Sequence, residues 1–533
     1  MTESKRSGVG RRAFIGAATI GAGAAAVGAR AQIAPQAYAG PAPQVDFPDD
    51  PRAFGGGGAA SGAVNRTEMD LRDCEVEGDL PAELDGVFYR VGPDPQYPKP
   101  APYVGDIPFD GEGHVSMFRI KGGHVDYRTR YAKNQRWKAQ AEARRSLFGM
   151  YRNPFTDDPS VEGLSRGTAN TQLFVHHGKL LVFKEDSPPV VMDPLTLETV
   201  DDYYTFGGKL ESRTHTAHPK IDPETGEYIA FGYEAGGLLS RDVNVLSATP
   251  QGDINWSVTV QAPYAGMMHD FYVTQRHVVL YLVNMVSDMD RIRAGGVHFS
   301  YDETAPCYLG VFRRGGDGRD IRWFKGPNMF CTHFMGGWSD GDKVTVDMDG
   351  GEGNQFPFFP SLHGGFDATK AIGRLRRFTV DLSSRSNDHY QSEVIFPQLT
   401  GVLSRQDDRF HTIPYRWGFM GGAMPAGADP RAAERGWAVI DHSTGNSRIL
   451  SVPGYRLAEM TFVPRRKDAP EGDGYLIGIG DSEAEGGRSD LVLFDLANPD
   501  NVPIARVRMP FKCVGQVHGF WADSSDIPGA SVA

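Results

Sequence analysis

From Glu75 onward the chain consists of short apolar runs with β-strand character, separated by residues that favour turns. Runs such as GEYIAFGYEAG, RHVVLYLVNMV and GWAVIDHSTGNSRILSVPG place a strand before a turn, and several continue into a second strand. Strand pairs joined in this way are typical of the hairpins within propeller blades. A β-sandwich array would give similar runs, and the repeat is too degenerate to fix a period. The pattern predicts an all-β fold and leaves both architectures open.

The composition excludes several classes of protein. The 533 residues include 65 Gly and 36 Pro, with 23% charged and 40% hydrophobic residues, which rules out collagen, coiled coil and general disorder. The formal net charge of −12 argues against a nucleic-acid partner, because phosphate binding needs a basic surface. The four cysteines are far apart and form no CxxC pair. Neither a disulfide scaffold nor a structural zinc site is therefore expected.

The N-terminus has the features of an export signal. Residues 1–12 are polar and basic, residues 13–29 are small and apolar, and Ala29-Arg30-Ala31 offers a cleavage site. Arg11-Arg12 is similar to a twin-arginine signal, although Gly10 stands where Ser or Thr is usual. We expect export to the periplasm, or a cytoplasmic protein if this segment is an unprocessed tail. No later stretch is long and apolar enough to be a transmembrane helix.

Residues 133–150 (KNQRWKAQAEARRSLFGM) are the clearest helical candidate. They are rich in good helix formers, and Gly149 closes the segment. A structural role is expected. The basic, amphipathic character of the segment leaves contact with a membrane surface as an alternative.

Four of the fifteen histidines lie in or beside compact motifs: His218 in THTAHPKIDPETGE, His269 in GMMHDFYVT, His333 in CTHFMGGWSDGD and His518 in GQVHGFW. Their spacing alone defines no metal site, but a closed β-architecture can bring one residue from each of several blades onto a common axis. Imidazole suits iron, copper, nickel and zinc, and a set without thiolate disfavours structural zinc.

These four segments, together with FYRVGPDP and FDGEGHVSMF near the start, resemble the carotenoid cleavage oxygenase family over about Glu75 to Trp521. The resemblance implies a seven-bladed β-propeller with a helical and loop cap over the face that bears an axial iron. It also implies one Fe²⁺ per chain and O₂ as co-substrate. The iron ligands carried over are His218, His269, His333 and His518. His215 is the competing candidate for the first position, and the His-Pro-Lys-x-Asp-Pro pattern favours His218.

The same resemblance implies carboxylates that orient the histidine rings. The matching positions are Glu185, in VFKEDSP, and Glu459, in AEMTFVP; a surface charge is the alternative interpretation of each. A third glutamate usually precedes a Phe-Pro pair, but here Ile395 stands in that place. Two alternatives follow: Glu393 is displaced into that role, or one histidine is held differently.

The segments YRNPFTDD and LLVFKEDSPPVVMDP are most similar to the lignostilbene dioxygenase branch, which cleaves the central double bond of 4-hydroxystilbenes into two aromatic aldehydes. In that branch a Tyr and a Lys bind the phenolic oxygen and a Phe packs on the ring. The matching positions are Tyr151, Lys184 and Phe109. The residue types suit the chemistry, because a stabilised phenolate makes the alkene a better nucleophile. Without the resemblance, Lys184 would be read as part of a solvated turn.

The predicted organisation is a signal peptide at 1–31, a flexible linker at 32–70 that is rich in Ala, Pro and Gly, and one propeller dioxygenase domain at 71–533. The expected partner is a small aromatic substrate. Two other functions are weighed: an apocarotenoid oxygenase with the same iron, and a non-catalytic periplasmic propeller that serves as a binding module. The first would prefer polyenes in a competition assay. The second would hold no stoichiometric iron and consume no oxygen.

Overall fold

The structure is a computed structural model that describes residues 66–103, 106–429 and 433–530. The predicted signal peptide 1–31 and most of the predicted linker lie outside the described residues. The described residues form seven antiparallel sheets of four or five strands and one two-stranded hairpin. No helix in this described part is long and apolar enough to cross a membrane.

Two sheets combine strands from both ends of the chain. The first has the order β1 (Met69–Leu71), β5 (His124–Tyr131), β4 (Gly113–Lys121), β3 (Gly86–Pro93), β32 (His518–Asp523). The last has the order β2 (Val76–Gly78), β31 (Ala505–Arg508), β30 (Ser489–Asp495), β29 (Gly474–Ser482), β28 (Tyr455–Pro464). An early strand thus completes the last sheet and the final strand completes the first. This exchange closes the ring of sheets with backbone hydrogen bonds.

The five sheets between them each follow chain order. They are β6–β9 (Gln172–His176, Lys179–Phe183, Val190–Met192, Thr199–Asp201), β10–β13 (Lys220–Ile221, Tyr228–Tyr233, Asp242–Ala248, Ile254–Gln261), β14, β15, β18 and β19 (Phe271–Val273, His277–Leu282, Cys307–Arg313, Arg322–Gly326), β20–β23 (Phe330–Asp340, Lys343–Gly351, Arg374–Asp381, Gln391–Val394) and β24–β27 (Leu399–Gln406, Trp417–Pro425, Gly436–Asp441, Asn446–Leu450).

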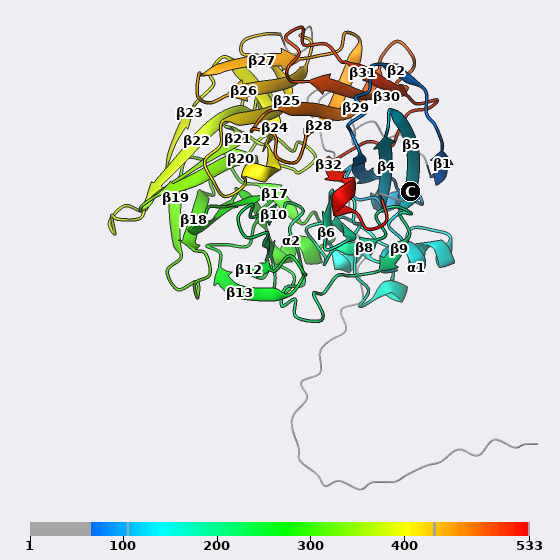
Figure 1. The fold of residues 1–533 in the computed structure, drawn as a ribbon. Helices are drawn as coiled ribbons and strands as arrows, with labels where there is room; N and C mark the ends of the chain where they lie inside the picture. The colour runs from blue at the N-terminus through cyan, green and yellow to red at the C-terminus, as the bar shows by residue number, and fades with distance from the viewer. Residues whose placement is uncertain (1–65, 104–105, 430–432, 531–533) are drawn as a thin grey trace, which may run out of the picture. The chain divides into compact units, whose positions relative to one another are not determined.

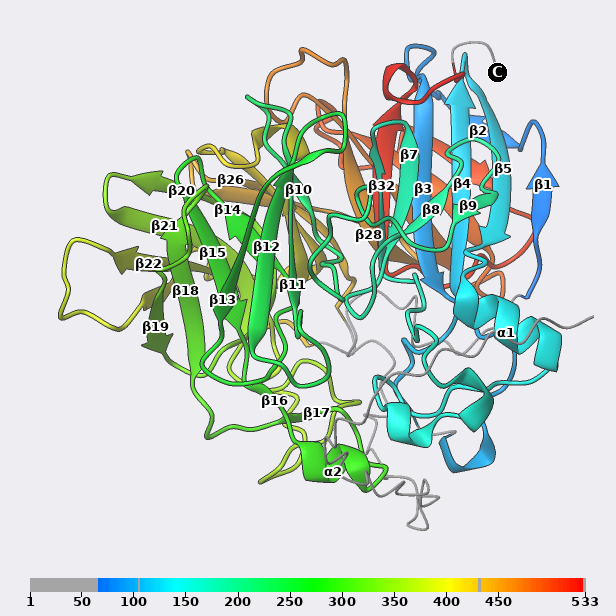
Figure 2. The same ribbon diagram turned by 90° about the horizontal axis from the view of Figure 1, so that it is seen from below.

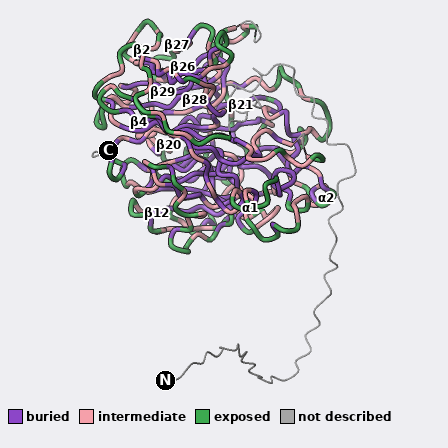
Figure 3. Tube along the Cα trace, turned by 90° about the vertical axis from the view of Figure 1, so that its right-hand side faces the viewer, coloured by how far each residue is buried: buried purple, intermediate pink, exposed green. Residues whose placement is uncertain are grey.

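The seven sheets are arranged as blades around a common axis (Figure 1). Strands next to the axis contact those of neighbouring blades: β20 contacts β14 and β24, and β32 contacts β6 and β28. Apolar side chains from facing sheets fill the space between blades, so most strands are buried along their length (Figure 3). The predicted seven-bladed propeller is confirmed. The sandwich alternative is wrong.

The two α-helices of the described residues, α1 (Gln135–Ala143) and α2 (Met289–Arg293), lie at the same end of the strands (Figure 2). The hairpin of β16 (Met285–Ser287) and β17 (Phe299–Tyr301) lies beside α2, and the short 3₁₀ turns Ala101–Tyr103, Pro154–Thr156 and Pro159–Val161 belong to the connections around α1. Together these segments form the cap.

The helix predicted over 133–150 is about half that length. The side chain of Asn134 caps its start by accepting the Trp137 N–H at 3.1 Å, and Arg144 ends it with a left-handed φ of 54°. The Gln140 side chain then accepts the Leu147 N–H, which fixes the following chain in a non-helical path. The end of the predicted linker also differs, because Met69 and Asp70 already belong to β1 and pair with β5.

Candidate functional site

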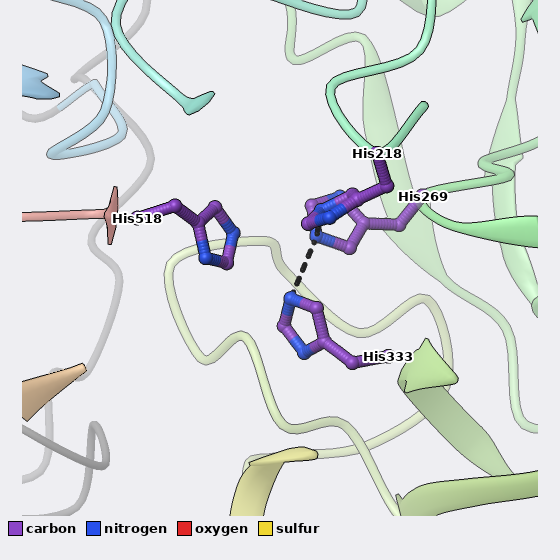
Figure 4. A group of neighbouring side chains, drawn as sticks. All are labelled: His218, His269, His333 and His518. Atoms are coloured by element: carbon purple, nitrogen blue, oxygen red, sulfur yellow. Dashed lines mark hydrogen bonds between the residues drawn. The ribbon is translucent and has the colours of Figure 1, made fainter. Parts of the chain in front are cut away.

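The four motif histidines lie together on the propeller axis, and we call them the histidine cluster: His218, His269, His333 and His518. His218 and His269 each lie two residues before the first strand of their blades, His333 lies within β20, and His518 opens β32. The His269 Nε2 lies 3.1 Å from that of His218 and 3.2 Å from that of His333. One ligand atom from each of the four rings lies within 4.8 Å of the others. Figure 4 shows the rings converging from separate elements.

β-Bulges direct two of the site's side chains inward. The register of β20 against β21 shifts between Cys331 and Phe334, which is where His333 lies. The register of β28 against β29 shifts between Leu457 and Met460, which is where Glu459 lies. A bulge adds a residue to one strand and changes the direction of its side chains. These shifts explain how two side chains on paired strands can point to the axis.

Carboxylates contact the outer ring nitrogens of two of these histidines by hydrogen bonds. The Nδ1 of His269 bonds Glu185, and the Nδ1 of His518 lies 2.9 Å from Glu459 Oε1. Burial raises the pKa of both carboxyl groups, but the neighbouring imidazoles outweigh that effect, and each pKa is lowered to about 2. Both carboxylates therefore stay ionised and hold the Nδ1 protons.

The third ring faces an aspartate instead of a glutamate. The Nδ1 of His333 lies 3.7 Å from Asp349 Oδ2, and Asp349 is fully buried. Thr332 Oγ1 and the Ser404 N–H hold the two carboxylate oxygens of Asp349. Burial lowers the pKa of His333, but the Asp349 carboxylate outweighs it, and the net shift is upward.

Glu393 does not take the third position. It is exposed on the edge strand β23, opposite Arg377, and Ile395 packs against the apolar core. The geometry therefore favours the second alternative, in which one histidine is held differently. The available signal was a pair of acidic residues, Asp347 and Asp349, in the strand KVTVDMDGG, which is buried from Val344 to Gly351.

Asp270 connects three segments that bear cluster histidines, and sequence reasoning missed it. Its Oδ1 accepts from Lys220 Nζ at 2.9 Å, two residues after His218. Its Oδ2 accepts the Phe334 N–H at 2.9 Å, one residue after His333. Because Asp270 itself follows His269, one buried carboxylate fixes the spacing of three blades at the axis. The sequence does place opposite charges beside two of the histidines, Lys220 in the motif HPK and Asp270 in the motif HDF.

The histidine cluster fits a metal ion. Carboxylates occupy the Nδ1 side of the rings of His269 and His518, so the Nε2 lone pairs point toward the shared centre. Nε2 atoms 3.1 to 3.2 Å apart that share no proton repel each other unless a cation lies between them, and imidazole nitrogens are good ligands for iron. Burial and the neighbouring imidazoles lower the pKa of His218 well below its usual value, so its ring is neutral and able to bind a metal.

His215 lies outside the cluster. Its Nδ1 lies 2.8 Å from the Thr216 carbonyl, its Nε2 lies 3.1 Å from the Tyr228 hydroxyl, and its ring stacks on Phe183. Both ring nitrogens thus have partners within the blade, which leaves His218 as the residue at the axis.

Lys184 and Tyr151 form a buried pair beneath the cap. The Lys184 ammonium lies 5.2 Å from the centre of the Tyr151 ring, and the two residues are 6% and 5% exposed. Burial raises the pKa of the Tyr151 hydroxyl well above its usual value. Lys184 is therefore not part of a solvated turn. Among the described residues, neither the Lys184 ammonium nor the Tyr151 hydroxyl has a hydrogen-bond partner.

An aromatic wall extends from this pair to the cluster, and we define it by Phe109, Phe356, Phe358 and Phe359. Phe109 contacts Phe358 edge-on at 5.2 Å, and Phe358 stacks on Phe356 at 5.2 Å. Phe356 lies 6.4 Å from the ring of His269, and Phe359 lies 6.3 Å from Tyr151. Sequence reasoning found Phe109 but missed the other three, although NQFPFFP is an unusual aromatic run for a loop.

Comparison with known proteins shows which family has this arrangement. The profile of the family described as retinal pigment epithelial membrane protein (RPE65) matches residues 62–523. The chain belongs to the RPE65/carotenoid cleavage oxygenase family. This family contains the relatives described next.

The chain is 42% identical over 481 residues to lignostilbene-α,β-dioxygenase isozyme III of Sphingomonas paucimobilis, covering 87% of this chain and 96% of that protein. It is 36% identical over 467 residues to isoeugenol monooxygenase of Pseudomonas putida, covering 86% and 95%. The crystal structure of lignostilbene dioxygenase from Pseudomonas brassicacearum is similar with a TM-score of 0.82 and 38% identity, covering 90% of this chain and 99% of that one.

Proposed function

We propose that this chain is a non-haem iron(II) dioxygenase that cleaves the central C=C bond of 4-hydroxystilbenes with O₂ into two aromatic aldehydes. The observation that carries the proposal is the Lys184–Tyr151 pair: a buried ammonium and a buried hydroxyl without partners among the described residues. Because neither group donates a hydrogen bond to the described residues, both can donate to a ligand that supplies an oxygen acceptor. A phenol or phenolate supplies that oxygen, and the similarity to lignostilbene dioxygenases supports this choice.

In this proposal the residues act in two groups. Lys184 and Tyr151 bind the phenolic oxygen, and the Lys184 charge favours the phenolate, which increases electron density at the conjugated alkene. The aromatic wall holds the two rings in a plane that leads to the histidine cluster and excludes water. Fe²⁺ bound by His218, His269, His333 and His518 would supply the activation of dioxygen. Glu185, Glu459 and Asp349 would keep the imidazoles oriented.

The experiment that tests this function is a paired assay on iron-loaded protein. One vessel contains resveratrol or a lignostilbene and the other an apocarotenoid, and products are identified by absorbance and mass. Two aromatic aldehydes from the stilbene alone would support the proposal. Cleavage of the apocarotenoid alone would instead support the polyene-cleaving alternative, which the buried Lys184 disfavours because a polyene has no phenolic oxygen whose charge a lysine could stabilise. Absence of bound iron and of oxygen consumption would support the non-catalytic binding module.

We also propose export through residues 1–31, on the strength of the sequence alone. The test is to replace Arg11 and Arg12 together by Lys in the full chain and to compare periplasmic and cytoplasmic fractions. Loss of the periplasmic form in this variant would support a twin-arginine route, while a native chain that stays in the cytoplasm would contradict it.

A further inference from the structure

A second buried network lies beside Tyr151, and Arg152 is at its centre. The Arg152 Nη2 contacts Glu234 Oε2 at 2.6 Å, and Nη1 donates to the Tyr233 hydroxyl at 2.6 Å. Its guanidinium also lies 4.9 Å from the centre of the Tyr233 ring. Arg152 and Glu234 are 6% and 4% exposed. The cation is therefore fixed from two directions.

This network reaches the histidine cluster. The Tyr233 hydroxyl donates to Glu185 Oε2 at 3.2 Å, while the other oxygen of Glu185 bonds the Nδ1 of His269. An unbroken series of hydrogen bonds thus runs from Arg152 through two side chains to a ring of the cluster. Arg152 holds the Tyr233 hydroxyl, and that hydroxyl in turn fixes the position of Glu185 Oε2.

The network also fixes the main chain at the substrate side. His298 lies between Glu234, with Nε2 at 3.0 Å from Oε1, and the Arg152 carbonyl, with Nδ1 at 3.2 Å. Arg152 directly follows Tyr151, so holding its side chain and its carbonyl restricts the position of the Tyr151 ring. The same residue therefore acts on the phenol end and on the metal end of the site.

The local backbone supports a functional role for this pair. Arg152 and Glu234 both adopt left-handed conformations, with φ of 53° and 54°. Such a conformation costs a non-glycine residue on the order of 1–3 kcal/mol and persists only where the surrounding structure enforces it. A buried ion pair also adds little net stability, because removing both charges from water is costly. The pair is better explained by the geometry that it imposes than by stabilisation of the fold.

We propose that Arg152 is a positioning residue that sets Tyr151 and Glu185 relative to each other, so that one buried cation places both the phenol-binding hydroxyl and the ring of His269. The substrate half of this inference rests on the proposed function. The effect of Arg152 on the ring of His269 is inferred from the hydrogen bonds alone, and Co²⁺ affinity tests it independently of the substrate.

The test compares Tyr233→Phe, Arg152→Lys and a matched control, Tyr89→Phe, in the full chain. Tyr89 is also fully buried and donates one hydrogen bond, to the Pro194 carbonyl at 2.6 Å, away from this network. Three quantities are measured: Co²⁺ affinity of the metal-free protein by chelator competition, the visible spectrum of the Co²⁺ form, and the separate KM and kcat values with iron and a 4-hydroxystilbene.

Tyr233→Phe should lower Co²⁺ affinity about 10-fold and change the Co²⁺ spectrum, with KM within about twofold, because it removes the link to Glu185 but keeps the anchor of Tyr151. Arg152→Lys should lower Co²⁺ affinity to a similar extent and also raise KM at least about fivefold, since an ammonium does not replace the two-point contact. Tyr89→Phe should leave the Co²⁺ affinity, the Co²⁺ spectrum and KM unchanged.

Co²⁺ affinity and spectrum in Tyr233→Phe that match those of Tyr89→Phe would overturn the proposal. The Tyr233→Phe variant still tests the proposal if Arg152→Lys fails to fold, because Phe keeps an aromatic ring beside the Arg152 guanidinium. A protein that cleaves no stilbene but whose Tyr233→Phe variant loses Co²⁺ affinity would refute the proposed substrate and leave the link to the metal standing.

Discussion

Lys184 and Glu185 are consecutive residues whose side chains serve different parts of one site. The Lys184 ammonium faces the Tyr151 ring, while Glu185 bonds the Nδ1 of His269. Both are buried directly after β7, at its axial end. A single turn of the chain therefore joins Lys184, which binds the phenol in the proposed function, to a carboxylate of the histidine cluster, and mutations at these two neighbours should have separable effects.

Replacing Lys184 by Met should reduce kcat/KM for a 4-hydroxystilbene at least about 100-fold, because the phenolic oxygen loses its buried cation. Iron content should stay at one per chain, since no cluster histidine depends on Lys184. Steady-state kinetics and metal analysis measure the two effects. Lys209→Met, at an exposed lysine, is the matched control. Unchanged activity in Lys184→Met would remove this residue from the mechanism.

Alanine at His218, His269, His333 or His518 should abolish stoichiometric iron, because each Nε2 contributes to the same centre. His215→Gln should keep iron at the native level, since both nitrogens of His215 are engaged inside the blade. Iron per chain after reconstitution is the measurement. A fully iron-loaded alanine variant would show that its histidine is not a ligand.

The metal-free protein should lose stability as the pH falls from 6.5 toward 4. Burial lowers the pKa of His215 from 6.5 to about 4, so the folded ring stays neutral where the unfolded one takes up a proton. Protonation therefore favours the unfolded chain in this window, and the stability is fully present above it. The loss due to His215 between pH 7 and pH 5 is about 2 kcal/mol. His215→Gln should reduce the pH dependence of urea unfolding by that amount, and an unchanged slope would contradict it.

Lys99 joins the two segments of the cap that bear Phe109 and Tyr151. Its ammonium contacts the carboxylates of Asp106 and Asp110 and lies 2.5 Å from the Gly149 carbonyl, while Asp106 accepts the Tyr151 N–H at 2.8 Å. Lys99→Met leaves the buried carboxylate of Asp106 without its cation, while Asp110 keeps Arg136, and should lower the free energy of unfolding by about 3–5 kcal/mol. It should also raise KM, because Phe109 and Tyr151 lose their common anchor.

Denaturant unfolding measures the stability effect of Lys99→Met. The control is Arg145→Met, which removes a cation of the same cap that is 59% exposed and pairs with Asp158. That change should cost less than about 1 kcal/mol, because solvent screens an exposed pair. Equal losses in the two variants would contradict the role assigned to Lys99.

The histidines and the propeller could be predicted because short continuous motifs of the sequence resemble a known family; the strand pattern alone left a β-sandwich open. Asp349 could not, because its place opposite His333 depends on a bulge in β20 that shifts the register with β21. The helix over 133–150 was overestimated because local propensity favours it past Arg144, whereas the Gln140 side chain redirects the chain there. Local patterns mark residues such as Asp349 and Asp270 as unusual, but the partners of these residues are distant in the sequence and no local pattern encodes those contacts.

Asp349→Asn provides the last test of the site, together with Glu393→Gln as its matched control. The asparagine keeps the shape of Asp349 but removes the charge that raises the pKa of His333 and faces its Nδ1 at 3.7 Å. Metal affinity should fall about 10- to 100-fold, as expected when a carboxylate behind a ligating imidazole is lost. Glu393→Gln should bind metal normally, because that residue is exposed at the edge of its blade. Chelator competition measures both. Weakened binding in Glu393→Gln with normal binding in Asp349→Asn would reverse the assignment and return the third carboxylate to β23.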